Sequence, residues 1–117
     1  MNVVTKDLDN EGRIKLIQLT GEMDAVEASS IEQVIEKFVE DGCKGLILEM
    51  AGVSYIDSSG IRVLLSTYKK LKPPDGNFTI LQPSEQVVMI LELADLLDIL
   101  SISQSMDDAL QAVSESE

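Results

Sequence analysis

Two hydrophobic periodicities alternate along this chain, and that alternation restricts the fold more than any other property of the sequence. Between residues 28 and 39, apolar side chains recur every three or four positions, which is typical of one face of an α-helix. The run Leu46-Ile47-Leu48 is continuously apolar, which is typical of a strand buried on both faces. Such alternation predicts an α/β fold with a mostly parallel sheet.

The same patterns place the remaining elements in the order ββαβαβαβα. The expected strands are residues 2–8, 13–20, 46–48, 78–81 and 99–102, and the expected helices follow Asp24, Gly60, Pro83 and Ser105. The first two strands form a hairpin, so the sheet is predicted to be mixed with covering helices. Residues 21–24 are expected to break the second strand, and residues 51–60 to form a loop.

Length and composition indicate one domain, expected at residues 1–113, followed by a short acidic tail at 114–117. A chain of 117 residues can bury a core of its own, and 44% of it is apolar. No window is apolar enough to span a bilayer, and the N-terminus lacks the apolar core of a signal peptide. We therefore expect a cytoplasmic protein.

Charge and residue types exclude several classes of function. The net charge of −12 disfavours binding to nucleic acid or to anionic membranes. There is no histidine and only one cysteine, Cys43, so the common catalytic triads, dyads and Cys-rich zinc sites are absent. These residue types thus favour none of those sites, and we expect no cofactor, no metal and no catalytic residue.

The charges are distributed unevenly along the chain. All nine bases fall in residues 1–72, whereas residues 73–117 carry nine acids and no base. One interpretation is simple solubility. The other is that the basic residues lie near a site in the first half of the chain.

The most suggestive motif is Asp57-Ser58-Ser59-Gly60, which follows the buried strand and begins a helix. Ligand sites of open α/β sheets gather where strands end and helices begin. A serine hydroxyl there is suited to act as an N-cap, and a phosphate on Ser58 would face unpaired backbone N–H groups. Gly60 would keep the turn free of side-chain bulk, and Asp57 could bind a metal or orient an incoming group.

An ordinary structural role for these residues remains open from the sequence. Asp57-Ser58-Ser59-Gly60 is also typical of a simple helix cap. Asp24 and Glu27 have the spacing of a capping box, and they too could serve only to begin a helix.

Taken together, the motifs resemble the STAS domain family, in its bacterial anti-sigma-factor antagonist branch. The resemblance covers nearly the whole chain. It is carried by Gly21-Glu22-Met23-Asp24, by the apolar strand before Asp57–Gly60, and by the leucine-rich segment Val87–Leu100. It implies a non-enzymatic switch, in which the unmodified protein binds an anti-sigma factor that is also a serine kinase and thereby frees a sigma factor.

The resemblance also implies roles for individual residues. The kinase would phosphorylate Ser58, and its complex with this chain would then dissociate. A serine phosphatase would remove the phosphate and restore the binding form. Asp24, Asp57, Ser59, Gly60 and Arg62 would belong to the surface around the phosphoacceptor. The oligomeric state is left open.

Two departures from the family pattern stand out. Arg62 occupies a position that is often glycine, and it could pair with a phosphate on Ser58 or alter the choice of partner. The late Leu-Thr-Gly-Leu turn is replaced by Leu93-Ala94-Asp95-Leu96, so the geometry of that turn is left open.

Two further functions compete with the switch. The chain could be a constitutive STAS scaffold in a stress-signalling or lipid-transport complex, with a serine that is never modified. It could instead resemble a two-component receiver that accepts phosphate on Asp57. Receiver domains need a lysine late in the chain. Residues 73–117 contain none, which disfavours the receiver hypothesis.

Overall fold

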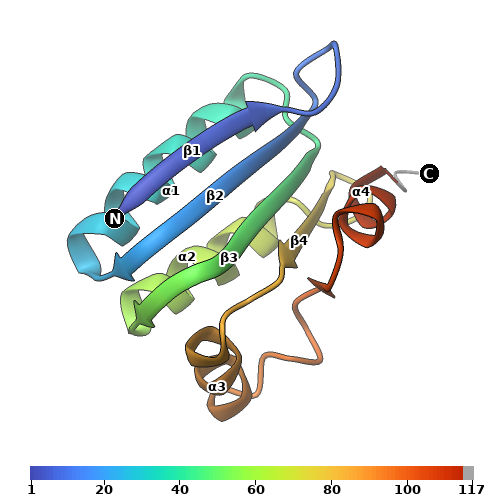
Figure 1. Cartoon of the computed structure of the whole chain (residues 1–117). Coiled ribbons are helices and arrows are strands. Elements are labelled where there is room, and N and C mark those ends of the chain that lie inside the picture. The colour runs from blue at the N-terminus through green and yellow to red at the C-terminus, as the bar shows by residue number, and fades with distance from the viewer. Residues whose placement is uncertain (115–117) are drawn as a thin grey trace.

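The computed structural model describes residues 1–114 and arranges them as a mixed sheet covered by helices (Figure 1). Within these residues the elements follow the predicted order. They are β1 (Asn2–Asp7), β2 (Ile14–Met23), α1 (Ala25–Glu40), β3 (Gly45–Ile56), α2 (Ser58–Lys70), β4 (Asn77–Leu81), α3 (Glu85–Leu93), β5 (Ile102–Ser103) and α4 (Met106–Ser114).

The order of the strands in the sheet is their order in the chain, β1-β2-β3-β4-β5. β1 runs antiparallel to β2, and β2, β3, β4 and β5 are parallel to one another. This confirms the predicted fold class, a mostly parallel mixed sheet. Because each parallel strand is followed by a helix, successive helices begin at the same edge of the sheet, beyond the carboxyl ends of the strands.

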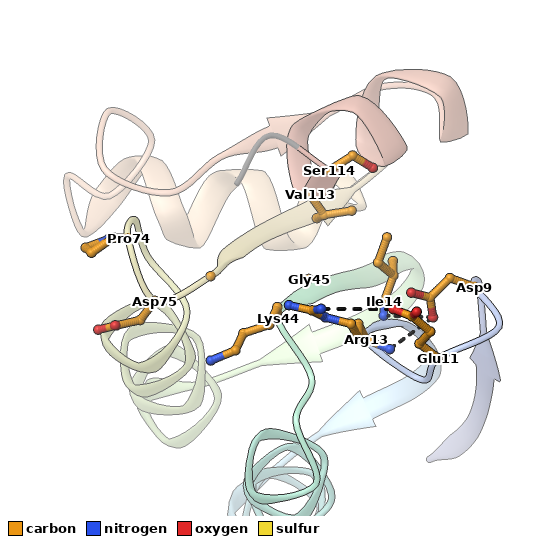
Figure 2. A pocket seen from close by; sticks show the side chains of 11 residues that line it. Asp9, Glu11, Arg13, Ile14, Lys44, Gly45, Pro74, Asp75, Val113 and Ser114 are labelled. Atoms are coloured by element: carbon orange, nitrogen blue, oxygen red, sulfur yellow. Dashed lines mark hydrogen bonds and ion pairs between the residues drawn. The ribbon is translucent and has the colours of Figure 1, made fainter. Parts of the chain in front are cut away.

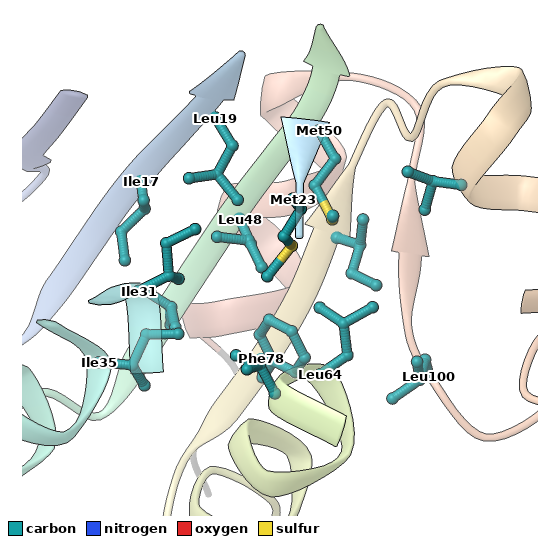
Figure 3. Packing of buried hydrophobic residues seen from close by; sticks show 14 of the residues in the cluster. Ile17, Leu19, Met23, Ile31, Ile35, Leu48, Met50, Leu64, Phe78 and Leu100 are labelled. Atoms are coloured by element: carbon teal, nitrogen blue, oxygen red, sulfur yellow. The ribbon is translucent and has the colours of Figure 1, made fainter. Parts of the chain in front are cut away.

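Side chains from the two faces of the sheet form two separate cores. Leu46 and Leu48 of β3 point into the larger core beneath α1, α2 and α3, whereas Ile47 points into the smaller core beneath α4. The prediction of a strand buried on both faces is therefore confirmed. Figure 3 shows the larger core, which is almost entirely aliphatic. Truncating one of its leucines to alanine costs about 2–5 kcal/mol in comparable cores.

β2 and β3 are longer than their apolar runs predicted. β2 continues through Gly21 to Met23, and β3 continues to Ile56, so the expected break at 21–24 and the expected loop at 51–60 are wrong. The reason is that β4 pairs with β3 only as far as Glu49, and beyond that point β3 pairs with β2 alone. One face of this extension is exposed, so its sequence is polar enough to look like a loop.

The structure bears on the expected acidic tail and on the expected absence of a membrane span. The predicted tail begins at Ser114, the last residue of α4, and residues 115–117 lie outside the described part of the structure. The division into a domain at 1–113 and a tail therefore stays a prediction. Among the described residues, no helix is both long and apolar enough to cross a membrane.

Candidate functional site

The site is built where β2 and β3 end side by side. Met23 is the register partner of Ile56, and each strand is followed directly by an aspartate that caps a helix. Oδ1 of Asp24 accepts a hydrogen bond from the backbone N–H of Glu27 at 3.0 Å, at the start of α1. Oδ1 of Asp57 accepts one from the backbone N–H of Ser59, also at 3.0 Å, at the start of α2. The structure therefore brings together the two loops that the sequence singled out.

The cap of α2 is Asp57 and not Ser58, which corrects the sequence-based assignment by one residue. Asp57 has extended backbone angles (φ −122°, ψ −167°), and Ser58 is the first residue of the helix. A carboxylate with an extended backbone reaches the orphan N–H groups of the first turn, so the serine is not needed there. The Ser58 side chain is exposed and forms no hydrogen bond with any other described residue.

The second carboxylate oxygen of Asp57 is also engaged. The hydroxyl of Tyr55 donates to Oδ2 of Asp57 at 3.3 Å. The negative charge of Asp57 and this hydrogen bond raise the pKa of Tyr55, and the charges of Asp24 and Glu22 add to the effect. Asp57 is thus a structural residue with both oxygens occupied. In the part of the chain that is described, no three acidic, histidine or cysteine side chains are placed to hold a metal ion.

Sequence analysis did not single out Tyr55, although the sequence contained a signal that places it beside Asp57. Tyr55 is the register partner of Glu22, and it precedes Asp57 by two residues. Residues two apart on a strand point to the same side, so an extended segment before the motif would have placed the two side chains together. The expected loop at 51–60 concealed this relation.

Gly60 is the third residue of α2 and is buried, so the turn that it keeps free of side-chain bulk is the first turn of the helix. A Cβ atom at this position would lie 2.5 Å from Cγ1 of Ile56 and 3.2 Å from Sδ of Met23. The glycine instead lets the first turn of α2 approach the ends of β2 and β3. This close approach positions Ser58 next to the ends of β2 and β3.

Arg62 and Ser59 take different positions on α2. Arg62 follows Ser58 by four residues, so both lie on one face of the helix, and its side chain is exposed. Arg62 forms no ion pair with any residue among 1–114. Ser59 is half-buried, and its backbone N–H is the one that Asp57 caps.

The other bases do not gather around Ser58, and that they lie near a functional site in the first half of the chain stays a prediction. Several lie toward the opposite edge of the sheet, at helix ends or in the pocket there, namely Arg13, Lys37, Lys44, Lys69 and Lys70. That pocket is shown in Figure 2 and has a volume of about 410 Å³. Two of its three acids are already engaged, because Asp9 accepts from the backbone N–H of Arg13 at 3.0 Å and Glu11 lies 4.0 Å from the Arg13 guanidinium.

An apolar groove borders Ser58 on the side of α3. Its lining, which we call the α2–α3 groove, is Asp57, Ser58, Ile61, Ile90, Leu93 and Ala94, and its volume is about 320 Å³. Sequence analysis did not foresee the groove. No local signal could have shown it, because it depends on how far apart α2 and α3 stand.

The turn after α3 keeps its shape without the family glycine. Asp95 adopts the left-handed conformation (φ 59°) that glycine takes most readily. The backbone N–H of Leu96 donates to the carbonyl of Leu91 at 2.9 Å, and that of Asp95 donates to the carbonyl of Glu92 at 3.1 Å. This pair of bonds is the Schellman motif, so the groove ends in a well-formed helix terminus.

Comparisons with known proteins agree with this architecture. A family model described as the STAS domain matches residues 5–109. An anti-sigma-B factor antagonist of Staphylococcus aureus is 26% identical over 104 residues, which cover 89% of this chain and 94% of that protein. The crystal structure of an anti-sigma factor antagonist from Mycobacterium paratuberculosis is 27% identical, covers 97% of this chain and 94% of its own, and superposes with a TM-score of 0.83.

A further neighbour was solved in two states. The unphosphorylated form of the anti-sigma factor antagonist SpoIIAA is 21% identical and superposes with a TM-score of 0.79, covering 94% of both chains. The phosphorylated form of the Bacillus cell fate determinant SpoIIAA is 20% identical, with a TM-score of 0.73, and covers 94% of this chain and 97% of its own. At this level of identity the likeness concerns the fold.

Proposed function

The chain belongs to the STAS domain family, and we propose that within it the chain acts as an anti-sigma factor antagonist. In its unphosphorylated form it binds an anti-sigma factor, which releases a sigma factor for transcription. The anti-sigma factor is also a serine kinase that phosphorylates Ser58, and a serine phosphatase restores the binding form. The observation that carries the proposal is the exposed, unbonded hydroxyl of Ser58 at the first position of α2.

The local structure can accept a phosphate at Ser58 without unfolding. The cap of α2 is supplied by Asp57, so esterifying the Ser58 hydroxyl breaks no hydrogen bond that the helix needs. The dianion would lie at the positive end of the helix dipole, with Arg62 one turn further along the same face. The fold would therefore survive the modification, while the surface around Ser58 gains about 1.5–2 negative charges.

The proposed role is regulatory and cytoplasmic, and it requires no catalytic residue or cofactor in this chain. The relatives are named as antagonists of anti-sigma factors, which is a regulatory role. The receiver hypothesis gains no support, because both oxygens of Asp57 are held by Ser59 and Tyr55. A constitutive STAS scaffold remains the alternative, and the experiment below distinguishes it.

The test is phosphorylation by the anti-sigma factor kinase of the same organism. The full chain is incubated with the kinase and ATP, and the product is mapped by mass spectrometry. We expect transfer of the γ-phosphoryl group to Oγ of Ser58, with release of ADP, and no transfer in Ser58→Ala. The matched control Ser54→Ala changes another exposed serine near the end of β3 and should be modified like the wild type.

Binding completes this test. Calorimetry should show a complex with the unmodified chain and a loss of at least tenfold in affinity after phosphorylation. A kinase that binds the chain but never modifies it would favour the scaffold. Phosphate at a different residue, or unchanged affinity after modification of Ser58, would contradict the switch.

A further inference from the structure

We propose that the α2–α3 groove receives the apolar ridge of a helix of the partner protein, and that this helix carries lysine or arginine along one flank. This inference rests on the proposed function and specifies the partner surface that Ser58 controls. It is carried by the juxtaposition of an apolar groove, an exposed hydrophobic ridge on α3 and a rim of unpaired carboxylates.

The apolar part of the surface is unusually exposed. Leu93 is 77% exposed and Met89 is 59% exposed, and the two lie one turn apart on α3. Ile61 and Ile90 form the floor between the helices, where both are partly buried against the core. A contiguous exposed apolar surface next to a groove is typical of a protein-binding site.

The groove favours a helix as its occupant. It lies between two helices, and α3, with nine residues, is about 13 Å long. That length accommodates two turns of a partner helix, whose side chains at positions i, i+3 or i+4 and i+7 would fill the groove in succession.

The charges around the groove define the flank of that helix. Glu85, Glu92 and Asp95 are exposed on or beside α3, and none of them is ion-paired within the described residues. Glu85 and Glu92 do not line the groove itself but a second hollow beside it, which Met89 lines too. Residues 73–117 contain no base that could neutralise these acids. Charge complementarity therefore calls for lysine or arginine on the partner.

Ser58 couples this groove to phosphorylation. Ser58 lines the groove beside Ile61 and Leu93, so a docked helix would cover its hydroxyl with apolar side chains. A neutral hydroxyl tolerates such burial, whereas a phosphate dianion would lose hydration that Arg62 and the helix dipole do not fully replace. Phosphorylation would thus expel the helix through desolvation, even though the flank of that helix is basic.

This mechanism makes a distinctive prediction about salt. Raising the salt concentration screens the rim carboxylates and should weaken binding of the unmodified chain. The fold-loss in affinity caused by phosphorylation should stay the same at low and high salt, because the cost is desolvation and not repulsion. A loss that disappears at high salt would overturn the desolvation step.

The groove can be tested without the natural partner. The full chain, labelled with nitrogen-15, is titrated with a synthetic amphipathic helix of leucine and lysine, and with the same peptide carrying glutamate in place of lysine. The basic peptide should shift the amide signals of Ile61, Ile90 and Leu93, and the acidic peptide should not. Shifts centred elsewhere on the molecule would overturn the proposal.

A pair of matched variants sharpens the result. Leu93→Ala removes an exposed side chain of the groove and should weaken the basic peptide at least fivefold. Met106→Ala removes another exposed apolar side chain, on α4 over the opposite face of the sheet, and should leave the affinity unchanged. Equal affinities of the two variants would overturn the proposal.

The same variants separate this inference from the proposed function. If the kinase modifies Ser58 and binds both variants equally well, the function stands and the groove is wrong. If no kinase modifies Ser58 but the peptide binds in the groove and Leu93→Ala weakens it, the groove stands and the switch is wrong.

Discussion

At the scale of single residues, Asp57 organises the site. Its Oδ1 caps α2 through the Ser59 N–H, and its Oδ2 accepts from the Tyr55 hydroxyl. Replacing an N-cap aspartate by alanine generally costs about 1 kcal/mol, whereas asparagine caps as well as aspartate does. Asp57 therefore holds the first turn of α2 in place and leaves the neighbouring Ser58 hydroxyl available.

The charge of Asp57 should be visible in the titration of Tyr55. In the background Tyr68→Phe, Tyr55 is the only tyrosine of the chain, so its ionisation can be followed by absorbance at 295 nm. We expect a midpoint above the ordinary value of 10.0, because a tyrosinate would face the Asp57 carboxylate. Asp57→Asn keeps the cap but removes the charge, and it should lower the midpoint.

The sign of the effect on stability follows from the same shift. A raised pKa means that the folded chain holds the phenol proton more tightly than the unfolded chain does. The resulting stabilisation is present below pH 10 and is lost as the pH rises through the folded-state pKa. A midpoint that Asp57→Asn leaves unchanged would show that Asp57 is not the source of the shift.

At the scale of elements, α3 ends in an unfavourable residue that its surroundings tolerate. Asp95 occupies the left-handed position of the Schellman motif, where a non-glycine residue is strained. Its carboxylate also lies at the negative end of the helix dipole. Leu96 anchors the turn, because it is buried beside Leu91 in the larger core. Packing and backbone hydrogen bonds thus maintain the Schellman motif despite Asp95.

Asp95→Gly should therefore stabilise the protein. Glycine removes both the left-handed strain and the misplaced charge, and we expect an increase of about 1 kcal/mol in the free energy of unfolding. Asp95→Asn removes the charge alone and should give a smaller increase. Both are measured by urea denaturation at constant salt. Destabilisation by glycine would mean that the Asp95 side chain supports the turn.

The elements also show what sequence could and could not predict. The types and order of the elements were predictable, because burial beneath α1, α2 and α4 imposes clear periodicities on the strands and helices. The ends of β2 and β3 were not, because their last residues have one exposed face. The family resemblance predicted that Asp24 and Asp57 share one surface, whereas the groove depends on the spacing of α2 and α3.

At the scale of the whole molecule, the parallel strands give the domain an electrical polarity. The N-caps of α1, α2 and α3, namely Asp24, Asp57 and Ser84, all lie beyond the carboxyl ends of strands. The last turns of α1 and α2 carry Lys37, Lys69 and Lys70 at the other edge. Acids at helix starts and bases at helix ends complement the dipoles, which explains why the bases lie away from Ser58.

The larger core extends to the junction between α1 and β3, where Cys43 is placed. Its side chain is 2% exposed, and its thiol donates to the carbonyl of Gly45 at 3.3 Å. Burial raises the pKa of Cys43, so the reactive thiolate is suppressed in the folded state. This single thiol therefore reports whether the junction opens alone or only with the whole domain.

We expect Cys43 to react with a disulfide reagent only when the whole domain unfolds. For a domain of ordinary stability, labelling should be at least about a thousandfold slower than in urea-unfolded protein. The logarithm of the rate should rise with urea with the slope of global unfolding, because the thiol lies in the core shared by α1, α2 and α3. The control Cys43→Ala/Ser54→Cys carries an exposed thiol and should label at nearly the unfolded rate. Fast labelling of Cys43 that is insensitive to urea would instead reveal local opening between α1 and β3. The domain would then unfold less cooperatively than its shared core indicates.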